Sequence, residues 1–188
     1  MVMRKTMFLP VLLSVGGLAA VLGCAGKTRY DVPRIDLLTP VQAKVGASVV
    51  ITGANFKSID FVSFGGANAG YHVDSDSQIT ATVPATAISY SVSVVNPAGV
   101  GHSLTPFLVV PQITAISPES GPAATVITLT GSGFYDTTGV VIGGETPGAS
   151  TFTYNDPNRV TVVAGSTSGP VVLTASGIQV TGPVFTVQ

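Results

Sequence analysis

Two stretches of the chain decide its fold: SVVITGANF at residues 48–56 and VITLTGSGF at residues 126–134. Each is a run of β-branched residues that ends at a glycine and is followed three positions later by a phenylalanine. Side chains alternate between the two faces of a strand, so Val49 and Ile51 should point to the same side. The pattern therefore predicts, in each stretch, a strand with one buried face.

The residues that close each stretch also have expected roles. Gly53 and Gly131 are expected to end their strands at a turn, where a positive φ is easy only for glycine. Phe56 and Phe134 are expected to fold inward and close one end of a core. An exposed aromatic contact site is the alternative for these two rings, but the repetition of the position favours the core.

The two stretches belong to a longer internal repeat, which covers nearly all of residues 33–188. Most matches keep an offset of 78 residues, and a small insertion raises the offset to 81 where Gln78-Ile79-Thr80 aligns with Arg159-Val160-Thr161. The matching pairs are Pro33/Pro111, Ile35/Ile113, Pro40/Pro118, Ile51/Leu129, Gly53/Gly131, Phe56/Phe134, Gly65-Gly66/Gly143-Gly144, Gly99/Gly177 and Phe107/Phe185. The sequence thus predicts two copies of one domain, at 33–110 and 111–188.

Within each copy, the remaining apolar runs are short and separated by turn residues, and no helical period appears. Further strands are expected at 60–64, 78–83, 91–95 and 107–110, and at 139–142, 159–163, 170–174 and 185–187. About seven short strands in a unit of this length favour an immunoglobulin-like β-sandwich. The predicted fold is all-β, with two tandem sandwiches. Pro111 fixes its own φ and keeps Val110 extended, so a stiff, elongated pair is expected.

These residues resemble the IPT/TIG domain family. The second copy carries the pattern as Ile113-x-x-Ile116-x-Pro118-x-x-Gly121-Pro122, then 126–134, then Val140-x-Ile142-Gly143-Gly144. The first copy is similar but has Gln42-Ala43 where the family usually has Gly-Pro. The resemblance implies an early-set immunoglobulin-like sandwich. It implies no single function, because such domains serve as spacers, adhesive surfaces, dimerisation units or companions of carbohydrate-active domains.

The first 23 residues differ from everything that follows. Arg4 and Lys5 precede the uncharged stretch 6–22, which is the pattern of a secretory signal peptide. A membrane-spanning helix is the alternative, although the stretch is at the lower length limit and contains Pro10. Val21-Leu22-Gly23-Cys24 resembles the lipobox of bacterial lipoproteins. This resemblance implies cleavage before Cys24 and covalent attachment of diacylglycerol and acyl chains such as palmitate.

Residues 24–32 would then form a lipidated tether, and the membrane would be reached through the lipid anchor. Ala25, by the same resemblance, implies sorting to the outer membrane of the cell envelope. Only 9% of the residues are charged and the formal net charge is −1. The basic residues are scattered, which argues against nucleic acid as a partner.

Candidate sites for chemistry are few. Asp74 and Asp76 alternate like Ca²⁺ ligands, but Asp and Asn also begin turns, and turn formation is the favoured interpretation. His72 and His102 lack neighbours at metal-ligand spacing, and no cofactor is implied. No serine sits in a nucleophile-elbow motif, so an enzyme is not expected; a hydrolase with an unrecognised site is the remaining catalytic alternative.

The leading functional hypothesis is a membrane-anchored module that spaces or holds another envelope or surface protein, or a second copy of itself. The alternative is a carbohydrate-binding surface lipoprotein. Tyr71, Tyr90, Tyr135 and Tyr154 lie at expected strand or loop ends, where sugar-binding proteins place aromatic rings. Tyr135 and Tyr154 are the candidate glycan-binding residues, while structural packing is the competing role for such tyrosines.

Overall fold

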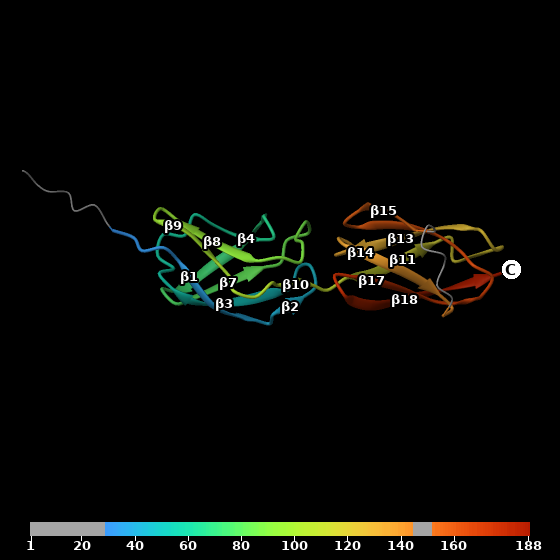
Figure 1. The fold of residues 1–188 in the computed structure, drawn as a ribbon, viewed down its shortest axis with the longest axis horizontal. Helices are drawn as coiled ribbons and strands as arrows, with labels where there is room; N and C mark the ends of the chain where they lie inside the picture. The colour runs from blue at the N-terminus through green and yellow to red at the C-terminus, as the bar shows by residue number, and fades with distance from the viewer. Residues whose placement is uncertain (1–28, 145–151) are drawn as a thin grey trace, which may run out of the picture.

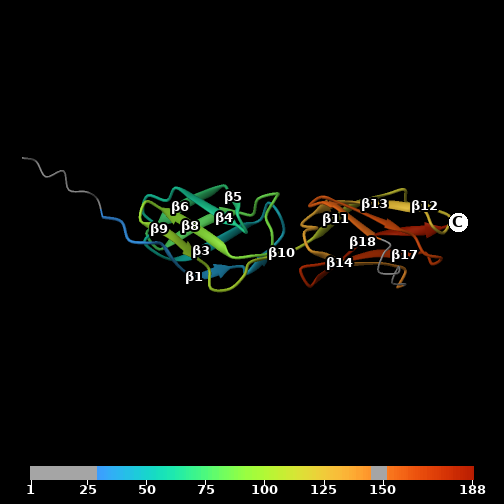
Figure 2. The ribbon, with the colours of Figure 1, turned by 45° about the horizontal axis from the view of Figure 1, so that its top comes forward.

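The computed structural model describes residues 29–144 and 152–188. Every regular element among these residues is a β-strand. The strands form two β-sandwiches that follow one another along the long axis of the molecule (Figure 1), and a turned view shows the same order (Figure 2). The all-β prediction with two tandem immunoglobulin-like sandwiches is confirmed.

The first sandwich contains ten strands, several of them very short. Its strands are β1 (Arg34–Thr39), β2 (Gln42–Ala43), β3 (Ser48–Ala54), β4 (Phe61–Phe64), β5 (Ala67–Ala69), β6 (Tyr71–Ser75), β7 (Gln78–Thr82), β8 (Val92–Asn96), β9 (Gly99–His102) and β10 (Leu108–Val109). One sheet has the order β1-β3-β7-β6 and the facing sheet has the order β5-β4-β8-β9. The β2 and β10 segments pair in parallel.

The described part of the second sandwich repeats this plan. Its strands are β11 (Gln112–Ser117), β12 (Ser120–Gly121), β13 (Val126–Ser132), β14 (Thr137–Ile142), β15 (Phe152–Asp156), β16 (Arg159–Val163), β17 (Gly169–Ala175) and β18 (Ile178–Val187). The two sheets have the orders β11-β13-β16-β15 and β12-β18-β17-β14. The C-terminus lies at the end of this sandwich that faces away from the first one (Figure 1).

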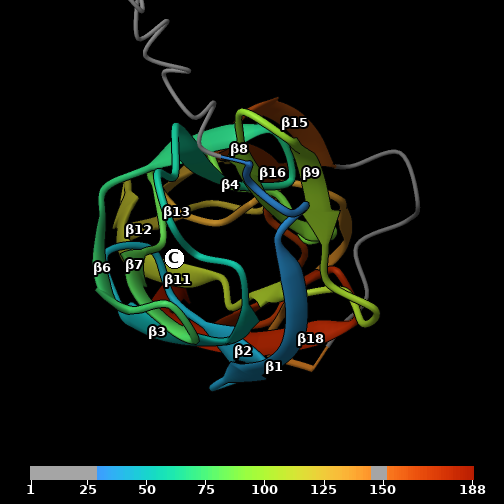
Figure 3. The same ribbon diagram turned by 90° about the vertical axis from the view of Figure 1, so that its left-hand side faces the viewer.

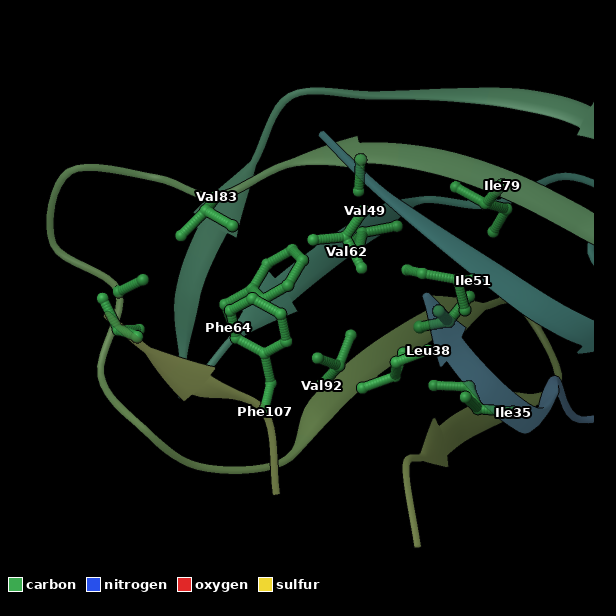
Figure 4. Packing of buried hydrophobic residues seen from close by; sticks show 14 of the residues in the cluster. Ile35, Leu38, Val49, Ile51, Val62, Phe64, Ile79, Val83, Val92 and Phe107 are labelled. Atoms are coloured by element: carbon green, nitrogen blue, oxygen red, sulfur yellow. The ribbon is translucent and has the colours of Figure 1, made fainter. Parts of the chain in front are cut away.

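Each sandwich encloses its own core, built from the inward-facing residues of both sheets. In the first domain, Val49 and Ile51 of β3 are fully buried and pack with residues of the opposite sheet (Figure 4). The rings of Phe64 and Phe107 meet edge to face, with their centroids 5.0 Å apart. The second core repeats the pattern with Ile127 and Leu129 fully buried. The predicted alternation of β3 and β13 is therefore confirmed.

The two phenylalanines after these strands are core residues. Phe56 and Phe134 both have no exposed surface and belong to the core of their own domain. Their backbone N–H groups donate to the carbonyls of Asp76 and Pro157. These bonds tie the residues after β3 and β13 to the loops before β7 and β16. The prediction that these two rings face the core is confirmed, and the alternative of an exposed aromatic contact site is wrong.

The expected role of Gly53 and Gly131 was wrong. Neither residue ends its strand, because β3 continues to Ala54 and β13 to Ser132. Neither has a positive φ; that conformation falls instead on Asn55 and Gly133. A Cβ on Gly53 would collide with the carbonyl of Arg34, and one on Gly131 with the carbonyl of Gln112. Close approach of the neighbouring strand, and not a turn, is what requires glycine here.

Two adjacent glycines suit a tight hairpin, and the Gly65-Gly66 pair forms one. Both glycines have positive φ, at 55° and 89°, and Phe64 pairs directly with Ala67 across the turn. Two positive φ angles in a two-residue loop match the twist of the flanking strands, and only glycine adopts them at low cost. Gly143 and Gly144 also have positive φ.

The segment that enters the first domain is held by two asparagines. Asn96 Nδ2 donates to the carbonyl of Asp31 at 2.8 Å, and Asn55 Nδ2 donates to the carbonyl of Val32 at 3.0 Å. In the second domain, the segment that enters the fold is the linker between the domains. There Gly133, the counterpart of Asn55, packs against Pro111. A view along the long axis shows the first sandwich in front of the second (Figure 3). The stiffness of the pair stays a prediction.

Candidate ligand-binding surfaces

The structure brings together the two candidate tyrosines of the second domain. Tyr135 lies in the loop between β13 and β14, and Tyr154 lies in β15, where it pairs with Val160 of β16. Their rings meet edge to face, with centroids 6.4 Å apart and an interplanar angle of 86°. The residues are 38% and 40% exposed, so each ring is half packed and half accessible. Such a pair holds its geometry and still offers aromatic surface to a ligand.

Two carboxylates accompany this pair of rings. Burial raises the pKa of Tyr154 above its ordinary value, and Asp156, Tyr135 and Asp136 raise it further. Asp156 is fixed in place because its Oδ1 accepts a hydrogen bond from the N–H of Asn158 at 2.8 Å. Aromatic rings beside fixed acceptor oxygens suit a ligand that carries hydroxyl groups.

The position of the tyrosine pair follows from the chain path. The loop that carries Tyr135 begins at Gly133, and a Cβ on Gly133 would lie 3.2 Å from the Cα of Pro111. Tyr135 is therefore close in sequence to the part of the second domain that packs against the linker.

The two candidate calcium ligands have different partners. Asp74 Oδ2 accepts hydrogen bonds from Thr80 Oγ1 at 2.8 Å and from Gln78 Nε2 at 3.3 Å. Asp76 Oδ2 lies 3.8 Å from Lys57 Nζ. Between residues 29–144 and 152–188, no three His, Cys, Asp or Glu side chains gather as a metal site requires. The contacts of the two aspartates are those of a turn and a surface ion pair.

The two histidines lie on opposite sheets of the first domain. His72 of β6 has its Nε2 4.0 Å from Asp74 Oδ1. His102 of β9 has its Nδ1 2.9 Å from Ser93 Oγ of β8. Each histidine therefore has a polar neighbour. His102 also lines a second candidate site, which the sequence did not reveal.

This second site is a hollow of about 350 Å³ beside the Gly65-Gly66 hairpin. Tyr90, Ser93 and His102 line it. Tyr90 and His102 are separate positions in the sequence, and no motif joins them. The sequence signal for this site is the alternation of side chains along β8. Because Val92 and Val94 face the core, Ser93 must face outward, beside the outward-facing residues of β9.

The remaining tyrosine of the candidate set has a structural role. Tyr71 is partly buried against the first core, and its hydroxyl donates to the carbonyl of Ile59 at 2.7 Å. This bond fixes the chain just before β4. Tyr90, in contrast, is 64% exposed.

Cys24 and the whole predicted signal peptide lie outside the described residues. In the part of the chain that the structure covers, no helix has the length and apolar character needed to cross a bilayer.

The fold defines a class: an all-β protein of two tandem immunoglobulin-like sandwiches, each with its own core. The IPT/TIG domain model matches residues 33–109 and 111–186, and the chain belongs to this family. A search of curated proteins found no match.

Solved structures with the same fold include surface glycan-binding proteins. The surface glycan-binding protein PbSGBP-B from Prevotella bryantii is 16% identical, with a TM-score of 0.50 over 84% of this chain and 42% of that one. SGBP-B from a xyloglucan utilization locus in Bacteroides uniformis is 21% identical, with a TM-score of 0.39 over 82% of this chain and 49% of that one.

The extracellular region of plexin A4 also matches, at 20% identity and a TM-score of 0.37, over 87% of this chain and 19% of that one. The chain thus spans less than half the length of these structures. The likeness to PbSGBP-B shows the fold alone.

Proposed function

We propose that this protein is a lipoprotein of the cell envelope, anchored through acylated Cys24, that serves as a structural and protein-interaction module. The observation that carries the proposal is the end-to-end order of two sandwiches behind a short, docked entry segment. Asn55 and Asn96 hold the carbonyls of Val32 and Asp31 against the first domain. Only the residues between Cys24 and this docked point separate the anchor from the fold, so the first domain lies near the membrane.

The surfaces of the molecule support interaction more than catalysis. Asp76 and His102 have neighbours outside this set, and His72 and Asp74 form a single pair 4.0 Å apart, whereas general acid–base or nucleophilic chemistry needs several such groups to converge. The partner in this proposal is another envelope or surface protein, or a second copy of the chain. The proposed location is the outer membrane, as Ala25 implies.

Two measurements test this proposal. Mass spectrometry of the native N-terminus should show acylated Cys24, and a chain that begins elsewhere would refute the anchor. Crosslinking in intact envelopes, followed by affinity capture, should recover a defined partner. A Cys24→Ser variant should lose membrane association and that partner together, whereas recovery of no crosslinked partner would count against an interaction module.

A second candidate function is carbohydrate binding at the surface, and the tyrosine pair favours it. Tyr135 and Tyr154 offer half-exposed rings beside Asp136 and Asp156. The PbSGBP-B structure from Prevotella bryantii, a surface glycan-binding protein, shares the fold. A glycan array probed with the full chain in detergent should then give a signal. That signal should fall with Tyr135→Ala or Tyr154→Ala and persist with Tyr71→Phe, which changes a tyrosine with a structural hydrogen bond.

A further inference from the structure

The hollow in the first domain, here called the Tyr90 pocket, has the features of a ligand-binding site. Its lining includes Gly65, Gly66, Ile88, Tyr90, Ser93 and His102, and its volume is about 350 Å³. Small-molecule sites are concave, with apolar and aromatic walls and a few placed polar groups, and begin at about 300 Å³. Gly66 leaves space at the hairpin, because a Cβ there would meet no atom within 4 Å.

The polar wall of the pocket is part of a row across three strands. Ser63 of β4 pairs with Ser93 of β8, and Ser93 pairs with His102 of β9. Ser93 Oγ and His102 Nδ1 are 2.9 Å apart, which fixes the imidazole ring. Within the described residues, no hydrogen-bond partner occupies His102 Nε2. A fixed ring with a free nitrogen can bind a ligand hydroxyl at little entropic cost.

The aromatic wall is Tyr90, which contributes little to the core of the domain. Its backbone forms a β-bridge with Phe107, so its position is set by a residue that is itself fully buried. Its own side chain is exposed. The face of such a ring carries partial negative charge and attracts the C–H groups of a flat, aliphatic ring face.

The second domain is an internal control for these positions. In the first domain Tyr90 pairs with Phe107. In the second domain the equivalent phenylalanine, Phe185, pairs with Gly169. The row Ser63–Ser93–His102 is replaced by Val141–Val172–Thr181. The same fold therefore forms without the tyrosine, the serines or the histidine, and their presence in the first domain is not a requirement of the sandwich.

The chemistry of the lining selects the class of ligand. No carboxylate, ammonium or guanidinium group lines the Tyr90 pocket. An anionic or cationic ligand would find no counter-charge there, whereas a neutral ligand with one apolar ring face and several hydroxyls would match both walls. A pyranose ring has this combination.

We propose that the Tyr90 pocket binds a neutral saccharide, whose ring stacks on Tyr90 while its hydroxyls bond to His102 and Ser93. The proposal goes beyond the function proposed above, because it depends neither on the lipid anchor nor on the Tyr135–Tyr154 pair. It places a sugar site in the domain next to the membrane tether.

The test is a glycan array, followed by titration of each hit, with the full chain purified in detergent. The array carries neutral oligosaccharides (β-glucans, mannans, galactans and xylans) and uronic-acid oligosaccharides for comparison. We expect binding of one or more neutral sugars. Tyr90→Ala and His102→Ala should each weaken it about tenfold or more, since each removes a main contact. Tyr90→Phe, which keeps the ring, should bind nearly as well as the native chain.

Matched controls separate this site from the others. Thr181→Ala changes the counterpart of His102 in the second domain and should leave affinity unchanged. Binding that is lost with Tyr154→Ala and kept with Tyr90→Ala would overturn the Tyr90 pocket and support the tyrosine pair instead. Absence of any neutral sugar among the hits would also overturn it, while crosslinking of a protein partner would still stand. Circular dichroism of each variant identifies any that fail to fold.

Discussion

At the scale of single residues, neighbouring strands approach closely where β1 passes β3 and where β11 passes β13. Gly131 sits opposite Ile113, and its missing Cβ leaves room for the carbonyl of Gln112 and the ring of Phe134. Gly53 has the same surroundings in the first copy. The glycine and the phenylalanine three residues later therefore form one packing unit, which explains why both positions repeat.

Gly131→Ala should destabilise the second domain by about 2–3 kcal/mol, the cost of overpacking a closed site. The added methyl would collide with backbone, which cannot rotate away as a side chain can. Gly139→Ala is the matched control, because a Cβ there would meet no atom within 4 Å and Gly139 lies in the same domain. Urea unfolding followed by circular dichroism measures both variants. Equal stability of the two would contradict the packing role of Gly131.

At the scale of elements, the β8–β9 hairpin organises the entry to the first domain. Asn96, at the end of β8, is 4% exposed and bonds in two directions. Its Oδ1 accepts from the N–H groups of Ala98 and Gly99, which closes the turn. Its Nδ2 donates to the carbonyl of Asp31, which lies 65 residues earlier. One side chain thus shapes the hairpin and also holds the tether.

Asn96→Ala should cost about 2–3 kcal/mol of stability, since it leaves buried backbone groups without partners. It should also loosen residues 29–32, which hydrogen exchange of their amides would detect as faster exchange. Asn68→Ala, at an exposed position of β5, should change stability by less than about 0.5 kcal/mol. Unchanged exchange in the tether of Asn96→Ala would show that Asn55 alone holds it.

At the scale of the whole molecule, two closed sandwiches are joined by a very short linker. Val109 belongs to the core of the first domain, and Gly133 of the second domain packs on Val109 and Pro111. The linker residues are thus shared between the two domains, and little chain is free to act as a hinge. Such a junction favours a stiff rod.

Small-angle X-ray scattering can test the stiffness of this junction. A protein that starts at residue 24 with Cys24→Ser should give the profile of one elongated particle. Insertion of six Gly/Ser residues between Val110 and Pro111 should broaden the distance distribution, because the domains would then move independently. The thermal stability of each domain should stay nearly unchanged, which serves as the control. Identical profiles for the two proteins would show that the native junction is already flexible.

The sequence by itself determined the duplicated β-sandwich, because its evidence is local and repeated. Alternation in 48–52 and 126–130 identified the buried faces, and Gly65-Gly66 identified a hairpin from two adjacent residues. The same sequence resembles a lipoprotein at Cys24, and that prediction depends on a short motif and on no tertiary contact.

Only the tertiary structure decided the sites. The requirement at Gly53 comes from the carbonyl of Arg34, on another strand, so chain-local reasoning assigned it to a turn. The Tyr135–Tyr154 contact and the Ser93–His102 bond join residues from separate strands or loops. Which outward-facing side chains become neighbours depends on strand order and register. Strand order and register are set by packing of the core, so the surface residues in the sequence do not reveal them.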